Sequence, residues 1–492
     1  MYSLGFDVGS SSIKVSLLDI ASGRCVASTM NPKSEAPIHA PQKGWAEQDP
    51  DSWWRYLCEG VQELRAAGHD LGKVRSIGIS YQMHGLVAVD REVHPVREAI
   101  IWCDSRAVAL GQQALEEIGY DRCMNSLLNS PGNFTASKLA WVKRNEPDVY
   151  ERIWKFMLPG DYIAYQLTGE VTTTASGLSE GVLWDFRQQC RADFVAEYFG
   201  IEADKFAELV PALGASLRTS GKIQEELGIP AGTPVSYRAG DQPNNAFSLN
   251  VLRPGEIAAT GGTSGVVYGV TDFPKPDAQS RVNTFLHVTP GAEQRMGVLL
   301  CINGTGVMNS WAHHHICPEL SYPEMNELAA QAPVGSDGLL VLPFGNGAER
   351  MLAGHASSAR FAGLDLVRHR RAELLRAVQE GIAFAFRYGI DLMKDLGLKP
   401  DVIRAGRANL FLSPLFRSTL ATLCDARIEL FDTDGALGAA RGAALGAGYY
   451  ADAEETFATL ERLDVIEPAA LWKQGLEDAF QAWKNELNKS IQ

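Results

Sequence analysis

Two similar segments, one at the start of the chain and one just past its midpoint, constrain the fold more than any other feature. In each, an apolar run typical of a β-strand leads into a turn of glycine and hydroxyl residues, and a second apolar run follows. The turns contain Gly9, Ser10 and Ser11 in the first segment and Gly262, Thr263 and Ser264 in the second. The repetition predicts a duplicated domain.

The length of the chain agrees with a duplication. At 492 residues it exceeds what one ordinary hydrophobic core organises, so the sequence predicts two domains with a cleft between them. We place the boundary near residue 248, between two turns rich in proline and glycine. This division gives an N-terminal domain of residues 1–248 and a C-terminal domain of residues 249–492.

Strand and helix patterns alternate along both halves and predict the α/β fold class. Apolar runs at residues 74–80, 85–89 and 338–344 are typical of strands. Residues 51–67 and 371–396 carry apolar side chains at helical spacing and predict amphipathic helices. With 46% hydrophobic and 21% charged residues, the chain has the composition of a folded protein with a large core.

Charge and cysteine spacing exclude several function classes. The formal net charge is −14 at pH 7 and the pI is near 5.3, whereas nucleic acids and anionic membranes bind clustered Lys and Arg. The eight cysteines show no Cys-x-x-Cys spacing, which argues against a zinc site or a disulfide framework and indicates reduced thiols. The chain shows neither a signal-peptide pattern nor a membrane-spanning apolar stretch. We therefore expect a cytoplasmic protein that binds neither nucleic acid nor membrane.

One carboxylate, Asp241, precedes the second glycine-hydroxyl turn and suggests phosphoryl transfer. Such a turn can hold phosphate oxygens, while a carboxylate accepts the proton of an attacking hydroxyl. Taken alone, each turn is equally compatible with a plain hairpin, and Asp241 with the N-cap of a helix that starts near Pro243. No Walker A motif is present. The triplet His313–His315 is not a metal site, because consecutive helical side chains point in different directions, and we expect a solvated face.

Motifs along nearly the whole chain resemble those of the FGGY carbohydrate kinases, most closely their xylulokinase branch. The main ones are the Asp-x-Gly-x-Ser loop at Asp7, Gln82-Met83-His84-Gly85, Asp241 and Gly262-Thr263-Ser264-Gly265, with weaker matches at residues 45–50, 102–106, 158–162 and 435–440. The resemblance implies two ribonuclease H-like domains of the actin and hexokinase superfamily, with ATP in the cleft between them. The implied activity is ATP-dependent phosphorylation of a ketopentose, D-xylulose first.

The resemblance also implies roles for residues of the catalytic centre. Asp241 is expected to be the general base, and Asp7 to bind Mg²⁺ through water, although an isolated Asp-x-Gly is commonly just a tight turn. The two glycine-hydroxyl turns are expected to bind the nucleotide phosphates. Gly406 and Asn409 match the adenosine-contacting turn.

A further set of residues matches the sugar pocket of the family. The expected sugar contacts are Gln82, Met83, His84, Trp102, Asp241 and Gln242. Asp104 and Arg106 either line the same pocket or form a structural ion pair.

Two departures from the family pattern concern the two binding sites. Arg404, Ala405 and Arg407 interrupt the adenosine turn, usually a run of glycines, which changes the shape or charge expected of the nucleotide pocket. Gln242 stands where asparagine is common, which leaves the preferred sugar open. A kinase for another ketose, a polyol or a sugar acid (ribulose, glycerol or gluconate) therefore remains an alternative, as does a non-catalytic sensor of sugar and nucleotide. A homodimer is one assembly that the sequence allows.

Overall fold

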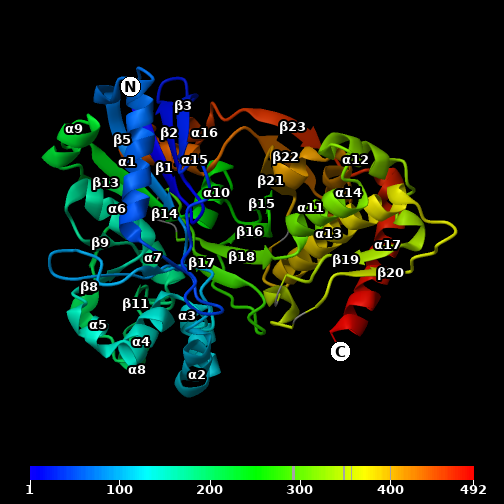
Figure 1. Ribbon diagram of the computed structural model, residues 1–492, viewed down its shortest axis with the longest axis horizontal. Helices are drawn as coiled ribbons and strands as arrows, with labels where there is room; N and C mark the ends of the chain where they lie inside the picture. Colours follow the sequence, from blue (N-terminus) through cyan, green and yellow to red (C-terminus); the bar gives the residue numbers. More distant parts are fainter. Residues whose placement is uncertain (291–293, 347–348, 356, 399, 492) are drawn as a thin grey trace.

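A six-stranded mixed sheet forms the centre of the N-terminal half in the computed structural model (Figure 1), which describes all residues except 291–293, 347–348, 356, 399 and 492. The opening segment forms the hairpin of β1 (Tyr2–Val8) and β2 (Ile13–Asp19), and β1 pairs in parallel with β5 (Val74–Tyr81). The strand order is β13 (Leu213–Arg218), β14 (Pro234–Gly240), β5, β1, β2 and β3 (Cys25–Asn31). Strand β5 is almost entirely buried, as expected for a central strand covered on both faces.

A seven-stranded sheet repeats this plan in the C-terminal half. Here β15 (Ile257–Gly261) and β16 (Gly265–Thr271) form the hairpin, and β15 pairs in parallel with β21 (Val402–Gly406). The strand order is β17 (Asn283–Leu286), β18 (Met296–Ile302), β16, β15, β21, β22 (Arg427–Phe431) and β23 (Arg462–Ile466). Read from β3 to β13 in the first sheet and from β18 to β23 in the second, neighbouring strands pair in the same order. Two antiparallel pairs are followed by two parallel pairs and one antiparallel pair. The predicted duplication is therefore confirmed in the sheet topology.

Two helices that follow equivalent strands cross between the halves. Helix α10 (Asp241–Ser248) follows β14 and packs against β15 and β16, whereas α15 (Gly435–Gly446) follows β22 and packs against β1, β5 and β14. Figure 1 shows the orange α15 beside the blue β1 and β2. A Cβ atom at Gly5 would lie 1.9 Å from the Ala436 carbonyl oxygen, so α15 and the first sheet meet backbone to backbone. The start of each crossing helix thus lies where the two halves meet.

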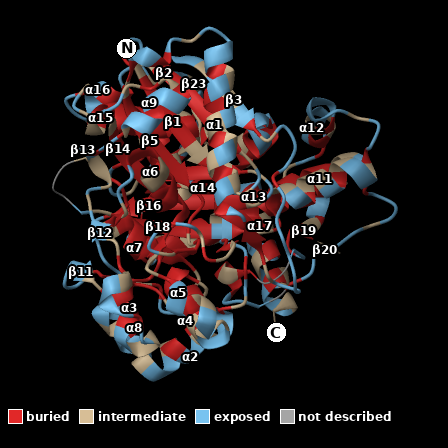
Figure 2. Ribbon diagram, turned by 60° about the vertical axis from the view of Figure 1, so that its left-hand side comes forward, coloured by how far each residue is buried: buried red, intermediate tan, exposed pale blue. Residues whose placement is uncertain are grey.

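Helices and short strands surround the first sheet. Helix α1 (Pro50–Ala66) packs on β2 and β3 and buries Trp53, Leu57, Val61 and Leu64. The region between β5 and β14 contains α2 (Val108–Ile118), α3 (Tyr120–Leu127), α4 (Thr135–Asn145), α5 (Pro147–Arg152), α6 (Pro159–Thr168), α7 (Ala175–Glu180), α8 (Asp193–Phe199) and α9 (Gly221–Leu227). Figure 2 shows α2, α3 and α8 at the exposed periphery and the sheet strands in the buried interior.

Five two-stranded ribbons complete the strands that the structure describes. They are β4 (Glu47–Gln48) with β7 (Ala99–Ile100), β6 (Val87–Val89) with β8 (Lys155–Met157), β9 (Thr172–Thr173) with β12 (Glu208–Leu209), β10 (Trp184–Asp185) with β11 (Cys190–Arg191), and β19 (Leu340–Leu342) with β20 (Arg360–Ala362).

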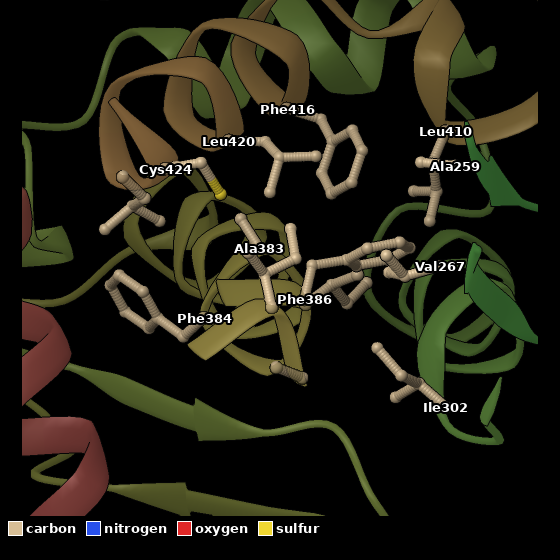
Figure 3. Packing of buried hydrophobic residues seen from close by; sticks show 14 of the residues in the cluster. Ala259, Val267, Ile302, Ala383, Phe384, Phe386, Leu410, Phe416, Leu420 and Cys424 are labelled. Atoms are coloured by element: carbon tan, nitrogen blue, oxygen red, sulfur yellow. The ribbon is translucent and has the colours of Figure 1, made fainter. Parts of the chain in front are cut away.

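The C-terminal half has its own core around a long central helix, α13 (Arg371–Lys394). In Figure 3, Phe386 of α13 lies between Phe416 of α14 (Pro414–Cys424) and Val267 of the second sheet. The remaining helices are α11 (Thr305–Ile316), α12 (Tyr322–Ala330), α16 (Ala453–Phe457) and α17 (Lys473–Ser490). None of the helices in the described ranges has both the length and the apolar character that a bilayer crossing requires.

The expected elements agree with the observed ones except where turns intervene. Residues 51–67 and 371–396 correspond to α1 and α13, and residues 74–80 to β5. The run 338–344 is shortened to β19, because Gly338 is left-handed with φ of 88° and Pro343 has no N–H for a ladder hydrogen bond.

Candidate functional site

Asp241 lies at the point where the chain leaves the first sheet. Strand β14 ends at Gly240, and α10 begins at Asp241 itself rather than near Pro243. Gly240 occupies the N-cap position and no side chain caps the helix, so the capping interpretation of Asp241 is wrong. A Cβ atom at Gly240 would lie 2.5 Å from Glu180 Oε2 and 2.6 Å from Met83 Cγ. The turn that presents Asp241 therefore has room only for glycine.

Asp7 and Asp241 come together although they are far apart in the sequence. Burial raises the pKa of Asp241 to about 7, and the negative charge of Asp7 acts in the same direction. Hydrogen bonds with Gln242 act in the opposite direction. Burial also raises the pKa of Asp7, with a smaller opposing contribution from its hydrogen bond with Ser80. The site thus contains two partly desolvated carboxyl groups, of which Asp241 titrates near neutrality.

The surroundings of Asp7 suit a hydrated divalent cation. Ser80 Oγ donates to Asp7 Oδ1 over 2.8 Å, and a Cβ atom at Gly435 would lie 2.3 Å from Asp7 Oδ2. Asp7 therefore lies at the beginning of α15, where Asp434 is paired with Lys14 at 2.5 Å. Carboxylate oxygens held in this way are the hard ligands that Mg²⁺ prefers.

The first glycine-hydroxyl turn is fastened to the sugar-side segments by residue Gln48. Its Nε2 donates to the Ser10 carbonyl oxygen over 2.6 Å, and its Oε1 accepts from Gln82 Nε2 over 3.3 Å. Trp102 Nε1 approaches Ser10 Oγ at 3.4 Å, and the Gly9 N–H closes the turn on Ser12 O at 3.1 Å. Sequence analysis did not assign a role to Gln48, although its motif was noted within residues 45–50.

The second turn lies beside the expected adenosine turn. A Cβ atom at Gly262 would lie 3.7 Å from Asn409 Nδ2, and Asn409 has a left-handed φ of 52°. Gly406 ends β21 three residues earlier. The Thr263 carbonyl oxygen accepts from the Val307 N–H at 3.2 Å, which anchors the turn to α11.

The two arginines near Gly406 differ in their environment. Arg404 points away from this turn, because it pairs with Glu429 at 3.1 Å and with Glu256 at 3.4 Å. It therefore has a structural role. Arg407 is exposed beside Ala408 and Asn409, so of the two it is the residue that changes the charge around the turn.

His84, an expected sugar contact, is fixed in a strained position. Its backbone has φ of 63°, and its Nδ1 donates to the Glu180 carbonyl oxygen over 2.8 Å. Burial lowers the pKa of the imidazole to about 3, so the ring is neutral and its Nε2 carries an acceptor lone pair. The ring contacts Phe134 and Phe285 at centroid distances of 4.9 and 5.2 Å, and Phe285 belongs to β17. Both halves therefore build the surroundings of His84.

The other expected sugar residues differ in how exposed their side chains are. Trp102 is 51% exposed, and Gln242 and Asp241 are partly exposed. Gln82 and Met83 are only 2% and 4% exposed, because Gln82 turns toward Gln48 and Met83 packs on Gly240. In this structure both side chains are therefore enclosed by protein.

Asp104 and Arg106 form the structural ion pair that sequence analysis left as an alternative. They are in contact at 2.7 Å and are almost completely buried. Arg106 also pairs with Glu47 at 2.7 Å and lies over the Trp45 ring at 3.7 Å from its centroid. Ala46 N–H donates to Asp104 Oδ2 at 2.6 Å, so the pair fixes the loop that carries Trp102.

Two further charged residues near His84 were missed, because only the fold brings them there. Glu180 is 2% exposed, and burial raises the pKa of its carboxyl group well above the ordinary value. Arg350, from the C-terminal half, contributes with its positive charge to the low pKa of His84. Burial lowers the pKa of Arg350, and no described residue forms an ion pair with it. Neither residue belongs to a motif that the sequence singled out.

The histidine triplet on α11 has local partners. His313 stacks on Tyr322 at 4.2 Å and donates through Nε2 to the Leu320 carbonyl oxygen at 2.7 Å, and His314 is hydrogen-bonded to Ser310. Among the described residues, the group close enough to share an ion is His39, Glu47 and Glu98. Glu47 in that group is already paired with Arg97 and Arg106.

Comparisons with known proteins match this architecture over nearly its full length. Residues 2–248 match the model of the N-terminal domain of the FGGY family of carbohydrate kinases, and residues 257–451 match that of its C-terminal domain. The chain is 27% identical over 494 aligned residues to the xylulose kinase of Bacillus subtilis, covering 98% of this chain and 96% of that one. Its fold is similar to those of a xylulose kinase from Rhodospirillum rubrum (TM-score 0.89, 24% identity, 99% of both chains) and a gluconate kinase from Lactobacillus acidophilus (TM-score 0.90, 22% identity, 99% of this chain and 98% of that one). The expected two-domain α/β fold is thereby confirmed.

Proposed function

The chain belongs to the FGGY family of carbohydrate kinases, and from this premise we propose that it phosphorylates D-xylulose at its terminal hydroxyl, forming D-xylulose 5-phosphate. The family establishes an ATP-dependent carbohydrate kinase, and the choice of sugar is our inference. The observation that carries the mechanism is the position of Asp241, partly buried at the start of α10 and under the influence of the Asp7 charge, with a pKa near neutrality.

In the proposed step, Asp241 accepts the proton of the sugar hydroxyl as the hydroxyl oxygen attacks the γ-phosphorus of ATP. A bond forms between that oxygen and phosphorus, the bond from the γ-phosphorus to the β,γ-bridging oxygen breaks, and ADP leaves. A base with a pKa of about 7 combines a substantial ionised fraction with enough basicity to accept the proton.

The remaining residues bind and orient the two substrates. Asp7 would hold Mg²⁺ through water, and the bound ion would neutralise charge on the phosphate oxygens. The backbone N–H groups and hydroxyls of Ser10, Ser11 and residues 262–264 would donate to the phosphates, Gly9 would allow their close approach, and Gly406 and Asn409 would lie beside the adenosine. His84 Nε2 would accept a sugar hydroxyl, and Gln242 and Trp102 would line the open side of the pocket.

Relatives support D-xylulose as the first substrate, because a xylulose kinase aligns with nearly the whole chain. A sugar acid is the second candidate, and Arg350 favours it. A half-buried guanidinium near His84 without an ion-pair partner among the described residues offers a counter-charge for a carboxylate. A gluconate kinase has a similar fold, which is a further reason to test a sugar acid beside D-xylulose.

The deciding experiment measures ADP release by the purified protein with Mg-ATP and a panel of sugars. The panel contains D-xylulose, L-xylulose, D-ribulose, L-ribulose, glycerol and gluconate, with a blank that contains no sugar. We expect release that depends selectively on D-xylulose. Selective release with gluconate would instead assign the sugar-acid candidate, and silence on every compound would favour a sensor that binds sugar and nucleotide without turnover.

Three properties of the whole molecule remain predictions. Sugar binding is expected to close the cleft, which would protect the segments between the halves from protease in the presence of D-xylulose. A homodimer would appear in sedimentation velocity as a species of twice the chain mass. A cytoplasmic location would be checked by cell fractionation.

A further inference from the structure

Lys138 is a fully buried lysine that no motif of the sequence singled out. It lies in the first turns of α4 and is 0% exposed. Its Nζ donates to two backbone carbonyl oxygens, that of His84 at 2.8 Å and that of Ile101 at 3.0 Å. No carboxylate of the described residues forms an ion pair with it, so backbone oxygens are its hydrogen-bonding partners.

The two carbonyls belong to the two segments that carry the sugar-side residues ahead of Asp241. His84 lies in the segment between β5 and β6, and Ile101 directly precedes Trp102. The beginning of α4 holds the first segment at further points, because Thr135 Oγ1 donates to the Gly85 carbonyl oxygen at 3.2 Å and the Phe134 ring packs on the His84 ring. Lys138 is therefore a link between two pocket segments that are remote in sequence.

His84 needs such a link more than an ordinary residue does. Its left-handed backbone, with φ of 63°, is a conformation that non-glycine residues rarely keep unless their surroundings hold them. The Glu180 carbonyl oxygen fixes the ring through Nδ1, and Lys138 fixes the backbone carbonyl of the same residue. Together these contacts determine where Nε2 points.

A buried lysine is an expensive way to satisfy two carbonyls. Taking an ammonium out of water is unfavourable without a counter-charge, and burial accordingly lowers the pKa of Lys138 to about 7, against the opposing charge of Asp104. An apolar residue in α4 would avoid this cost but would leave the carbonyl oxygens of His84 and Ile101 without this donor. The cost indicates that the position of these two carbonyls matters.

We propose that Lys138 is a positioning residue for the sugar pocket, which sets the distance between His84 and Trp102 by holding the carbonyl groups of His84 and Ile101. The inference rests on the proposed function for its kinetic consequence, and on the hydrogen bonds of Lys138 for its structural one. Lys138 acts through His84 and the Ile101–Trp102 segment and does not itself touch the reacting atoms.

The test compares Lys138→Met with Lys143→Met. Both lysines lie on α4, but Lys143 is partly exposed and pairs with Glu202 at 3.0 Å. We expect Lys138→Met to raise the KM for the sugar by about 10- to 100-fold, because small displacements of binding groups have effects of that size, and to leave the KM for ATP unchanged. Hydrogen exchange should accelerate in residues 82–86 and 101–104 of this variant. Lys143→Met should match the wild type in all three measurements.

Lys138→Arg provides the conservative variant. It keeps the charge and the donors but cannot place one nitrogen between both carbonyls, so we expect a smaller rise in the sugar KM and partial protection from exchange. It carries the test alone if Lys138→Met does not fold. An unchanged sugar KM and unchanged exchange in the variant would overturn the proposal.

Failure of the proposed function would look different. If the wild-type protein released no ADP with any sugar, the kinase assignment would fall, while hydrogen exchange in residues 82–86 and 101–104 would still decide the role of Lys138. If the wild type turned over a sugar and the Lys138 variants kept its KM, only the positioning role would fall.

Discussion

Asp241 and Asp434 occupy equivalent places in the two halves, yet their surroundings are opposite. Each follows the strand, β14 or β22, that leads into a crossing helix. Asp434 caps α15 by accepting from the Leu437 N–H at 2.9 Å, and it pairs with Lys14 at 2.5 Å. Asp241 is not the N-cap of α10 and has no ion pair among the described residues, and the charge that acts on its pKa is the like charge of Asp7.

The difference shows how a duplicated fold can assign different chemistry to matching carboxylates. A carboxylate that accepts a helix N–H and pairs with an ammonium contributes to structure. A buried carboxylate beside a like charge has a raised pKa and can exchange its proton near neutrality. The neighbours of each residue, rather than its place in the topology, therefore distinguish the proposed base from the helix cap.

Asp241→Asn gives the largest expected effect and tests the comparison directly. An amide cannot accept the sugar proton, so we expect kcat to fall by about 10²- to 10⁴-fold, while the dissociation constant for the sugar changes little. Kinetics of ADP release and calorimetric titration with sugar measure the two quantities. Asp434→Asn is the matched control and should keep most of the activity. Equal losses in the two variants would remove the distinction between base and cap.

Asp7→Asn should have the next largest effect. We expect activity to fall by about 10- to 100-fold and to need more Mg²⁺, because a ligand that acts through water loses its charge. The variant should also shift the acid limb of the activity profile to lower pH, since the negative neighbour that raises the pKa of Asp241 is gone. Titration of activity with Mg²⁺ at several pH values measures both changes. An acid limb at the same pH in the variant and the wild type would show that Asp7 does not influence the pKa of Asp241.

The pH dependence of the unmodified protein should report Asp241. The base must be ionised, so kcat/KM should rise with pH and level off above about 7, falling about tenfold per unit on the acid side. His84 should not contribute to this limb, because burial lowers its pKa to about 3. Initial rates between pH 5 and 9 test this expectation, and a profile that is flat across this range would contradict a titrating base.

Much of this architecture could be predicted from local sequence patterns. Apolar periodicity placed α1, α13 and β5 closely, and the two glycine-hydroxyl turns revealed the duplication, because hairpins depend on neighbouring residues. The roles suggested for Asp7, Asp241 and the phosphate turns came from family motifs, and they remain proposals that the influence of the Asp7 charge on the pKa of Asp241 supports.

What the sequence did not indicate depends on contacts between remote segments. Gln48, Glu180, Arg350 and Lys138 have no motif of their own, and their relation to the pocket follows only from the packing of the fold. The same reason applies to Arg404, which the sequence placed in the altered nucleotide turn but which pairs with Glu256 and Glu429. A residue type shows what a side chain can do, whereas its partner decides what it does.

The smallest expected effect concerns stability: substitution of Asp241 and of Asp434 should change it in opposite directions. The folded pKa of Asp241 lies above its unfolded value, so its ionisation opposes folding; this cost is absent below the unfolded pKa near 4 and complete above about 7. Asp241→Asn should therefore raise Tm more at pH 8 than at pH 5. Asp434→Asn should lower stability by up to about 1 kcal/mol at both pH values, since it removes the half-exposed ion pair with Lys14, whereas the amide oxygen can still cap the helix. Thermal unfolding of both variants at both pH values measures this, and a fall in Tm for Asp241→Asn at pH 8 would mean that Asp241, like Asp434, stabilises the fold.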